Sequence, residues 1–264
     1  MYNCCILGLG YIGLPTAACL AEAGHSILGV DINEDLVRSI NNCDVVIKEN
    51  GLKEILEKHV ISGKISAKTL PSKSEVFIIT VPTPFYPSKK ECPKPNIEYV
   101  LSATKSISKF LKPNDLILIE STSPVGTTKI VTNQIKNLIK FNVNDLHICY
   151  CPERVIPGKI IKELKENDRI IGSDNIKSAE LAKNFYKTFC KGYIHITDAN
   201  TAEMVKLMEN SFRDVNIAFA NELSIVCNKQ NIDHQELIYL ANFHPRVNIL
   251  SPGCGVGGHC IAID

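Results

Sequence analysis

The sequence predicts an α/β fold in which a Rossmann-like, doubly wound and mainly parallel sheet is followed by a long helix. Short apolar runs alternate with helical patterns from residue 4 to residue 196, which is typical of repeated β-α units. An uninterrupted helical pattern then covers residues 201–229. We therefore expect a Rossmann-like domain over residues 1–198 and a central helical, dimerising segment over residues 199–264.

Composition and charge exclude several classes of protein. The 264 residues carry a net charge of +1, with lysine and arginine scattered among acids, so neither nucleic acid nor a membrane is an expected partner. No apolar run approaches the roughly 18 residues of a membrane span, and no signal peptide is evident at the N-terminus. The 11 cysteines are an odd number without a regular framework, which favours a reducing, cytoplasmic location. No two of them have C-x-x-C spacing, so no metal site is expected.

The first strand, turn and helix carry a dinucleotide-binding pattern. An apolar run at residues 4–7 enters the turn Gly8-Leu9-Gly10-Tyr11-Ile12-Gly13, and a second strand at residues 26–30 ends on Asp31. In this pattern the glycines allow a tight turn and a close approach of the pyrophosphate, and the acid binds the adenosine ribose. A 2′-phosphate would be repelled by Asp31, so NAD is the expected cofactor. A glycine-rich turn without a ligand is the alternative. The expected cofactor contacts here are Gly8, Gly10, Tyr11, Ile12, Gly13 and Asp31.

The next elements extend the alternating pattern and place three polar loops at strand ends. The strand at residues 75–81 ends in Pro82-Thr83-Pro84, and the strand at residues 115–120 ends in a hydroxyl-rich loop, residues 121–128, that opens a helix and suits polar ligands. The strand at residues 147–150 ends in Cys151-Pro152-Glu153-Arg154. Because such ends meet at one edge of a parallel sheet, a single cleft is expected there. The remaining predicted elements of this domain are helices at residues 33–41, 52–60, 97–111 and 176–189 and strands at residues 169–172 and 193–196, and a shorter helix is predicted at residues 234–242, after the long one.

The long helical pattern has one apolar stripe and one polar pair. Asn200 and Glu203 have the spacing of a capping box. Lys206 and Asn210 are four residues apart and project side by side, although a lysine in such a helix is more often a solvated surface charge. At 1.5 Å per residue the helix is about 43 Å long, which favours a domain link or a dimer interface. The apolar stripe comprises Val205, Met208, Phe212, Val215, Phe219, Leu223 and Val226.

The last stretch surrounds a cysteine with glycines and stops at an aspartate. Residues 253–260 include four glycines before Cys260, and Asp264 follows four residues later. A thiol on such a loop can act as a nucleophile, with the carboxylate handling water. A frayed tail is the alternative.

Taken together, these motifs resemble the UDP-glucose/GDP-mannose dehydrogenase family over the whole chain. In their order and spacing they are highly specific. The matching segments are residues 8–15, 81–84, 121–122, 126–128, 151–154, 202–207, 209–214 and 255–260, together with Asp264.

The resemblance implies a four-electron oxidation of the C6 alcohol of a nucleotide sugar to a carboxylate, with two NAD⁺. It implies that Cys260 captures the aldehyde as a thiohemiacetal, which is oxidised to a thioester and hydrolysed. Lys206 and Asn210 would then stabilise the oxyanion, while Asp264 and Glu153 would position water or relay protons. The further residues implied at the site are Thr122, acting in catalysis and cofactor binding, Thr83 for the cofactor, and Glu153, Arg154, Lys206, Asn210, Arg213, His244, Arg246 and Gly257 for the substrate.

Two departures bear on substrate and completeness. Ala262-Ile263 stands where UDP-glucose-oxidising members carry Pro-Lys, so the chain looks like the branch that oxidises UDP-N-acetylmannosamine and serves polysaccharide biosynthesis, with UDP-N-acetylglucosamine as the nearest rival. Family members continue past this aspartate into a third domain that holds the UDP moiety. We therefore expect the chain to be a fragment or truncated form that binds NAD⁺ but turns over UDP-N-acetylmannosamine weakly or not at all unless the missing region is supplied.

Two other functions remain open from the sequence. A β-hydroxyacid dehydrogenase of the 6-phosphogluconate type shares the Rossmann domain, the long helix and the helical lysine, but needs no Gly-Gly-x-Cys loop. A non-catalytic, NAD-binding and dimerising fragment would bind the cofactor without producing NADH.

Overall fold

The computed structural model describes residues 1–44, 47–86 and 93–254, and its contacts divide the chain into two compact units, the first spanning Met1–Met204 and the second beginning at Val205. Each unit is described by itself. The strands are β1 (Asn3–Leu7), β2 (Ser26–Val30), β3 (Ile65–Lys68), β4 (Val76–Ile79), β5 (Leu116–Ile119), β6 (His147–Tyr150), β7 (Arg169–Gly172) and β8 (Ile194–Thr197). The helices are α1 (Gly13–Glu22), α2 (Glu34–Asn41), α3 (Leu52–Ile61), α4 (Glu98–Ser108), α5 (Thr127–Leu138), α6 (Ile160–Glu166), α7 (Ile176–Tyr186), α8 (Ala199–Gln230) and α9 (His234–Ala241), with a short 3-10 turn at Val143–Asp145.

The first unit contains an eight-stranded sheet in the order β3-β2-β1-β4-β5-β6-β7-β8. All neighbouring pairs are parallel except β6 and β7, which are antiparallel. The predicted Rossmann-like, mainly parallel sheet followed by a long helix is therefore confirmed. Because β2 and β4 flank β1 on opposite sides, the loops after β1 and β4 diverge at the carboxyl edge, which is where such sheets bind ligands.

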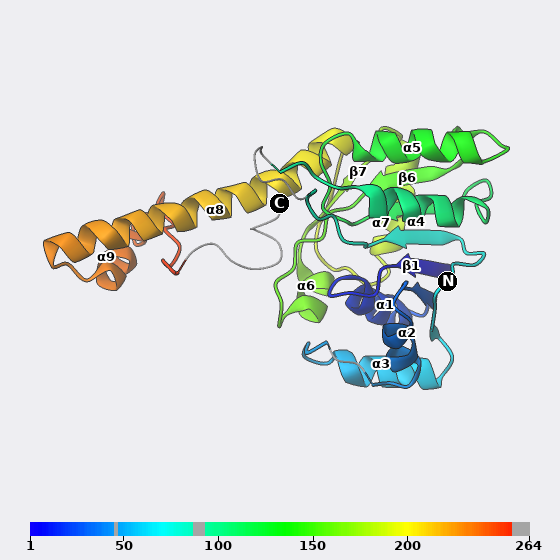
Figure 1. The fold of residues 1–264 in the computed structure, drawn as a ribbon, viewed down its shortest axis with the longest axis horizontal. Helices are drawn as coiled ribbons and strands as arrows, with labels where there is room; N and C mark the ends of the chain where they lie inside the picture. The colour runs from blue at the N-terminus through cyan, green and yellow to red at the C-terminus, as the bar shows by residue number, and fades with distance from the viewer. Residues whose placement is uncertain (45–46, 87–92, 255–264) are drawn as a thin grey trace. The chain divides into compact units, whose positions relative to one another are not determined.

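The sheet is buried on both faces because its strands alternate between two apolar clusters. In β1, Cys4 and Ile6 belong to the cluster packed by α1, α2, α3, α6 and α7, whereas Cys5 and Leu7 belong to the cluster packed by α4 and α5. Figure 1 shows α4 and α5 side by side over their face of the sheet. Since successive strand residues point to opposite faces, a continuous apolar run is what a strand covered on both faces requires.

Two elements of the first unit were not predicted. Strand β3 is an edge strand whose residues are alternately buried and exposed, and its small and polar residues give only a weak strand signal. Helix α6 has seven residues, too few to repeat a helical period clearly. Each is fixed by what it pairs with or packs on.

The predicted capping box at the start of the long helix is wrong. Helix α8 already includes Asn200, and Asp198 accepts hydrogen bonds from the amide and hydroxyl of Thr201 at 2.9 and 2.6 Å. Glu203 turns instead to the start of α5, where its carboxylate accepts hydrogen bonds from the Gly126 amide at 2.6 Å and from the Thr128 amide and hydroxyl at 2.7 and 2.6 Å. Glu203 binds these distant groups rather than the start of its own helix because the first turn of α5 has unpaired amide donors, and the fully buried Glu203 carboxylate needs hydrogen-bond partners.

In the second unit, three asparagines fasten the chain after α9. The Asn216 side chain donates to the Asn248 carbonyl at 2.8 Å and accepts from the Leu250 amide at 3.0 Å. Asn221 accepts from the Gly253 amide at 2.8 Å. The Asn242 side chain accepts a hydrogen bond from the Ile249 amide at 2.8 Å and donates one to the Ile249 carbonyl at 2.9 Å. The segment that leads toward the glycine-rich loop is thereby tied to α8. None of the helices over residues 1–44, 47–86 and 93–254 is long and apolar enough to cross a membrane.

Candidate cofactor and active site

The glycine turn after β1 has the geometry that a dinucleotide-binding loop requires. Gly8 has φ +94°, and a Cβ there would lie 2.8 Å from the Thr80 carbonyl oxygen. At Gly13 a Cβ would lie only 1.8 Å from the Gly8 carbonyl oxygen, so α1 approaches β1 more closely than any side chain allows. A Cβ on Gly10 would meet no atom of the described chain within 4 Å. Space is thus left at the position where a pyrophosphate approaches the backbone.

Asp31 lies beside this turn and is held by it. One carboxylate oxygen accepts a hydrogen bond from the Leu9 amide at 2.9 Å, and the other accepts one from the Asn33 amide at 2.9 Å. Each oxygen keeps a further lone pair with which to accept a ribose hydroxyl. The turn, the half-buried acid and the amino end of α1, where Tyr11 is 57% exposed, together fit NAD. The individual contacts remain predictions.

Two predicted polar loops meet through Thr83 and Thr122. The Thr83 hydroxyl donates to the Thr122 carbonyl oxygen at 2.6 Å, and the Ser121 hydroxyl donates to the Val81 carbonyl at 2.6 Å. The loops after β4 and β5 are therefore joined at the carboxyl edge of the sheet. A ligand was expected at the start of α5, but the Gly126 and Thr128 amides there already donate hydrogen bonds to the Glu203 carboxylate.

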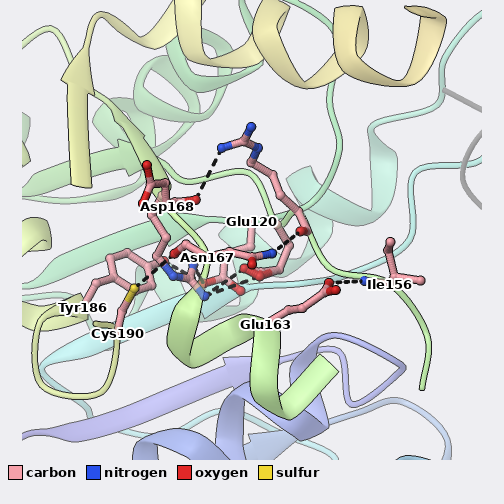
Figure 2. A network of polar contacts seen from close by, with 10 residues as sticks. Glu120, Ile156, Glu163, Asn167, Asp168, Tyr186 and Cys190 are labelled. Carbon is pink, nitrogen blue, oxygen red and sulfur yellow. Dashed lines mark hydrogen bonds and ion pairs between the residues drawn. The ribbon is translucent and has the colours of Figure 1, made fainter. Parts of the chain in front are cut away.

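The loop after β6 brings Glu153 into a buried polar network. Figure 2 labels two other members of this network, Glu120 and Tyr186. The Arg169 Nη2 atom lies 2.8 Å from Glu153 Oε1 and donates to Oε2 at 3.3 Å. The Tyr186 hydroxyl donates to Glu120 Oε1 at 2.6 Å, and Arg169 Nη1 lies 4.0 Å from that oxygen. Burial, followed by the charge of Glu153, raises the pKa of Glu120, although Arg169 and Tyr186 act in the opposite sense. Arg154 is half-buried and donates to the Asp168 carbonyl at 3.3 Å.

Four buried cysteines in the described part of the chain are poor nucleophiles. Burial raises the pKa of Cys5, Cys19 and Cys149 to about 12, and it raises that of Cys151 well above its usual value. At neutral pH these thiols are protonated, whereas the thiolate is the reactive form. Cys254 is exposed. The described residues also contain no cluster of side chains able to hold a metal ion.

The other predicted site residues belong to the second unit. Lys206 and Asn210 lie one turn apart on α8, Lys206 half-buried and Asn210 buried. Arg213 is exposed on the same helix. After α9, the exposed His244 ring accepts a hydrogen bond from the amide of Arg246 at 3.3 Å. The remaining three, Gly257, Cys260 and Asp264, lie outside the described residues.

Three network residues were missed from the sequence. Glu120, Arg169 and Tyr186 are each at least 95% buried. A signal was available for two of them, because a charged residue that directly ends or begins an apolar strand, as Glu120 and Arg169 do, requires a buried partner. The sequence around these two residues does not show which residue is the partner.

Comparison with known proteins agrees with the motifs. Residues 2–190 match the model for the NAD-binding domain of the UDP-glucose/GDP-mannose dehydrogenase family, and residues 200–264 match its central domain. The division expected at residue 198 stays a prediction. The chain is 52% identical to the UDP-N-acetyl-D-mannosamine dehydrogenase of Campylobacter jejuni and 50% identical to that of Methanococcus maripaludis, over 98% of its own length and 65% and 59% of theirs.

Solved structures give the same result. The UDP-N-acetyl-mannosamine dehydrogenase of Staphylococcus aureus superimposes with a TM-score of 0.89 at 47% identity, over 99% of this chain and 63% of that one. The enzyme of Pyrococcus horikoshii gives a TM-score of 0.92 at 42% identity, over 98% and 62%. The chain thus spans less than two thirds of the length of these relatives. With both of its segments matched, the chain belongs to the UDP-glucose/GDP-mannose dehydrogenase family and carries that family's NAD-binding domain.

Proposed function

We propose that the chain takes part in the NAD-dependent oxidation of the C6 alcohol of UDP-N-acetylmannosamine to the uronate. The observation that supports this substrate best is the identity of 52% and 50% to two UDP-N-acetyl-D-mannosamine dehydrogenases. The glycine turn with Asp31 beside it supports the cofactor. When bound, NAD⁺ supplies the acceptor for the hydride at each of two oxidations.

The chain's own residues are assigned to covalent capture and charge stabilisation. The Cys260 thiolate adds to the aldehyde carbon, and Lys206 with Asn210 donates hydrogen bonds to the oxygen that becomes an anion. After the second oxidation the adduct is a thioester, in which the thiolate is the leaving group. Glu153 and Asp264 direct water to the thioester carbon and accept its proton. Thr83 and Thr122, joined by a 2.6 Å hydrogen bond, border the nicotinamide end of the cofactor site.

For the substrate, we assign cationic and polar residues and one glycine. Arg154, Arg213 and Arg246 supply charge-assisted donors to the diphosphate and sugar, His244 supplies a polar ring edge, and Gly257 leaves room for the backbone to approach. Relatives also include an NDP-N-acetyl-D-galactosaminuronic acid dehydrogenase at 46% identity, so other 2-acetamido sugars are the relevant competitors in an assay.

The long helix supports a homodimer. Five large apolar residues of the predicted stripe on α8, Met208, Phe212, Val215, Phe219 and Val226, are between 51% and 67% exposed. An apolar surface of this kind marks an association site. A second copy is the simplest occupant, because one stripe can pair with itself across a two-fold axis.

The test is NADH formation from NAD⁺ with UDP-N-acetylmannosamine, UDP-N-acetylglucosamine and UDP-glucose in parallel, with and without the region expected to be missing. When that region is supplied we expect the first sugar to be oxidised fastest, with two NADH per sugar, and without it we expect weak or no turnover. Cys260→Ala should abolish the second oxidation, whereas Cys254→Ala, a matched change at an exposed thiol of the preceding glycine run, should leave it intact.

Two outcomes would replace the proposal. NAD⁺ binding without NADH from any of the three sugars, even with the missing region supplied, would favour the non-catalytic, dimerising function. An unchanged second oxidation in Cys260→Ala would remove the covalent mechanism. One NADH per substrate, unaffected by Cys260→Ala, would favour hydroxyacid dehydrogenase chemistry.

A further inference from the structure

The structure pairs Glu153 with an arginine that no motif identified. Arg169 opens β7, and its Nη2 atom lies within 2.8 and 3.3 Å of the two Glu153 carboxylate oxygens. The two side chains are 5% and 7% exposed. At this depth an ion pair is weakly screened by solvent, so its partners strongly influence each other's charge.

The pairing follows from the one antiparallel step in the sheet. Tyr150 of β6 is paired with Gly172 of β7. In an antiparallel pair the chain that leaves the end of one strand lies near the start of the other. Glu153 follows Tyr150 by three residues and Arg169 precedes Gly172 by three, so both lie at the same edge of the sheet. A parallel β7 would have placed its first residue at the opposite edge of the sheet, away from the loops that carry the polar residues.

Rigid neighbours hold the guanidinium group in place. Its central carbon lies 4.5 Å from the Tyr186 ring centroid and 5.4 Å from that of Phe189. Such contacts favour a cation and fix its plane. The titratable groups acting on this pair come from several elements: Glu120 after β5, Cys151 after β6, Tyr186 on α7, Cys190 after α7, and Cys19 on α1.

Two carboxyl groups compete for this cation, and they are not equivalent. Glu153 makes the short contact to Nη2, whereas the nearer Glu120 oxygen is 4.0 Å from Nη1 and accepts the Tyr186 hydroxyl. One guanidinium balances one carboxylate. Burial raises the pKa of Glu120, which favours its protonated form, whereas the short contact to Arg169 favours the ionised form of Glu153.

We propose that Arg169 is a positioning residue for Glu153, which keeps that carboxylate ionised and in one orientation, ready to accept a proton from water. The function of Glu153 in this statement rests on the proposed dehydrogenase reaction. The ionisation itself does not, since it requires neither sugar nucleotide nor turnover.

The experiment follows the titration of the carboxyl groups by NMR in protein labelled with ¹³C at glutamate Cδ. Glu153→Gln and Glu120→Gln assign the two signals. In Arg169→Met the midpoint of Glu153 should rise by about 1–3 pH units relative to the parent protein, because an adjacent cation is removed. Arg169→Lys keeps a cation without the two-point contact and should give a smaller rise.

The Glu120→Gln variant is the matched control. It removes the competing acid and keeps Arg169, so Glu153 should titrate at the same pH or lower. Circular dichroism and NAD⁺ binding report whether each variant is folded. If Arg169→Met does not fold, Arg169→Lys carries the test, since it retains the buried charge.

An unchanged Glu153 midpoint in the folded Arg169 variants would overturn the proposal. So would a rise confined to Glu120, because Arg169 would then serve the other carboxyl. An arginine with only a packing role would lower stability without moving either titration. Failure of NADH formation in the parent protein would leave this result intact, so failures of the two proposals are distinguishable.

Discussion

Gly10 and Gly13 lie three residues apart in the turn after β1 but serve different requirements. A Cβ on Gly13 would lie 1.8 Å from the Gly8 carbonyl oxygen, whereas one on Gly10 would meet no described atom within 4 Å. Gly13 is therefore needed by the fold itself. At Gly10 the described chain leaves space for a side chain, so any steric requirement for glycine there comes from the ligand.

We expect Gly13→Ala to lower the free energy of unfolding by about 2–3 kcal/mol, because α1 must move away from β1. Gly10→Ala should change it by less than about 0.5 kcal/mol but weaken NAD⁺ binding at least about tenfold, or 1.4 kcal/mol. Urea denaturation and calorimetric titration with NAD⁺ measure the two quantities. Undiminished NAD⁺ affinity in Gly10→Ala would remove the cofactor from this turn.

His25 makes stability depend on pH. Its Nδ1 accepts a hydrogen bond from the Tyr2 amide at 3.1 Å, so this nitrogen carries no proton in the fold. Its Nε2 lies 3.0 Å from the Thr188 hydroxyl, which itself donates to the Phe185 carbonyl at 2.7 Å. Burial, and then the positive N-terminus, lowers the pKa of His25 below its ordinary value of 6.5.

The folded state therefore binds fewer protons than the unfolded state just below pH 6.5, and stability should fall as the pH drops through that range. The slope for one proton is at most about 1.4 kcal/mol per pH unit. Urea denaturation between pH 7.5 and 5 should show wild type losing stability more steeply than His25→Gln. His59 and His147, whose pKa values are also lowered, remain in both proteins and cancel in the comparison. If the free energy of unfolding fell equally with pH in wild type and His25→Gln, this explanation of His25 would be contradicted.

Among the helices and strands, the joint between α5 and α8 depends on one carboxylate. Glu203 accepts three hydrogen bonds from Gly126 and Thr128. A carboxylate at a helix N-terminus also interacts favourably with the helix dipole. The contact connects the loop that contains Thr122 to the first turn of α8, both within the first unit.

Glu203→Gln should therefore destabilise the protein by about 1–3 kcal/mol, because the amide loses the negative charge and one acceptor. Glu222→Gln is the matched control, since Glu222 is an exposed acid on the same helix and should change stability by less than about 0.5 kcal/mol. Thermal and urea denaturation compare the two. Equal effects would show that the joint contributes nothing specific.

For the chain as a whole, the exposed stripe of α8 determines the expected assembly. Sedimentation velocity should show a dimer for the parent protein and a monomer for the double variant Phe212→Glu/Phe219→Glu, because two charges would be buried unpaired in the interface. Asn228→Glu adds a charge at another exposed position of α8, outside the stripe, and should remain dimeric. A monomeric parent protein at all concentrations would reject the homodimer.

Local pattern determined much of this protein. The alternation of strands and helices, the glycine turn ending in Asp31 and the length of α8 are all periodic or short-range features, and the fold class and family that they predicted are confirmed. The roles assigned to Cys260, Lys206, Asn210 and Asp264 stay predictions.

Only the tertiary structure decided which distant groups meet. Asn200 and Glu203 fit a capping box by spacing, yet Glu203 binds Gly126, 77 residues away. Glu153 faces Arg169 because β7 runs antiparallel to β6, a direction that no residue pattern specifies. The periodicity of apolar residues indicates which face of an element is buried. The pairing between distant polar groups depends instead on which segments the strand order and direction bring together, and these are determined by the packing of the whole sheet.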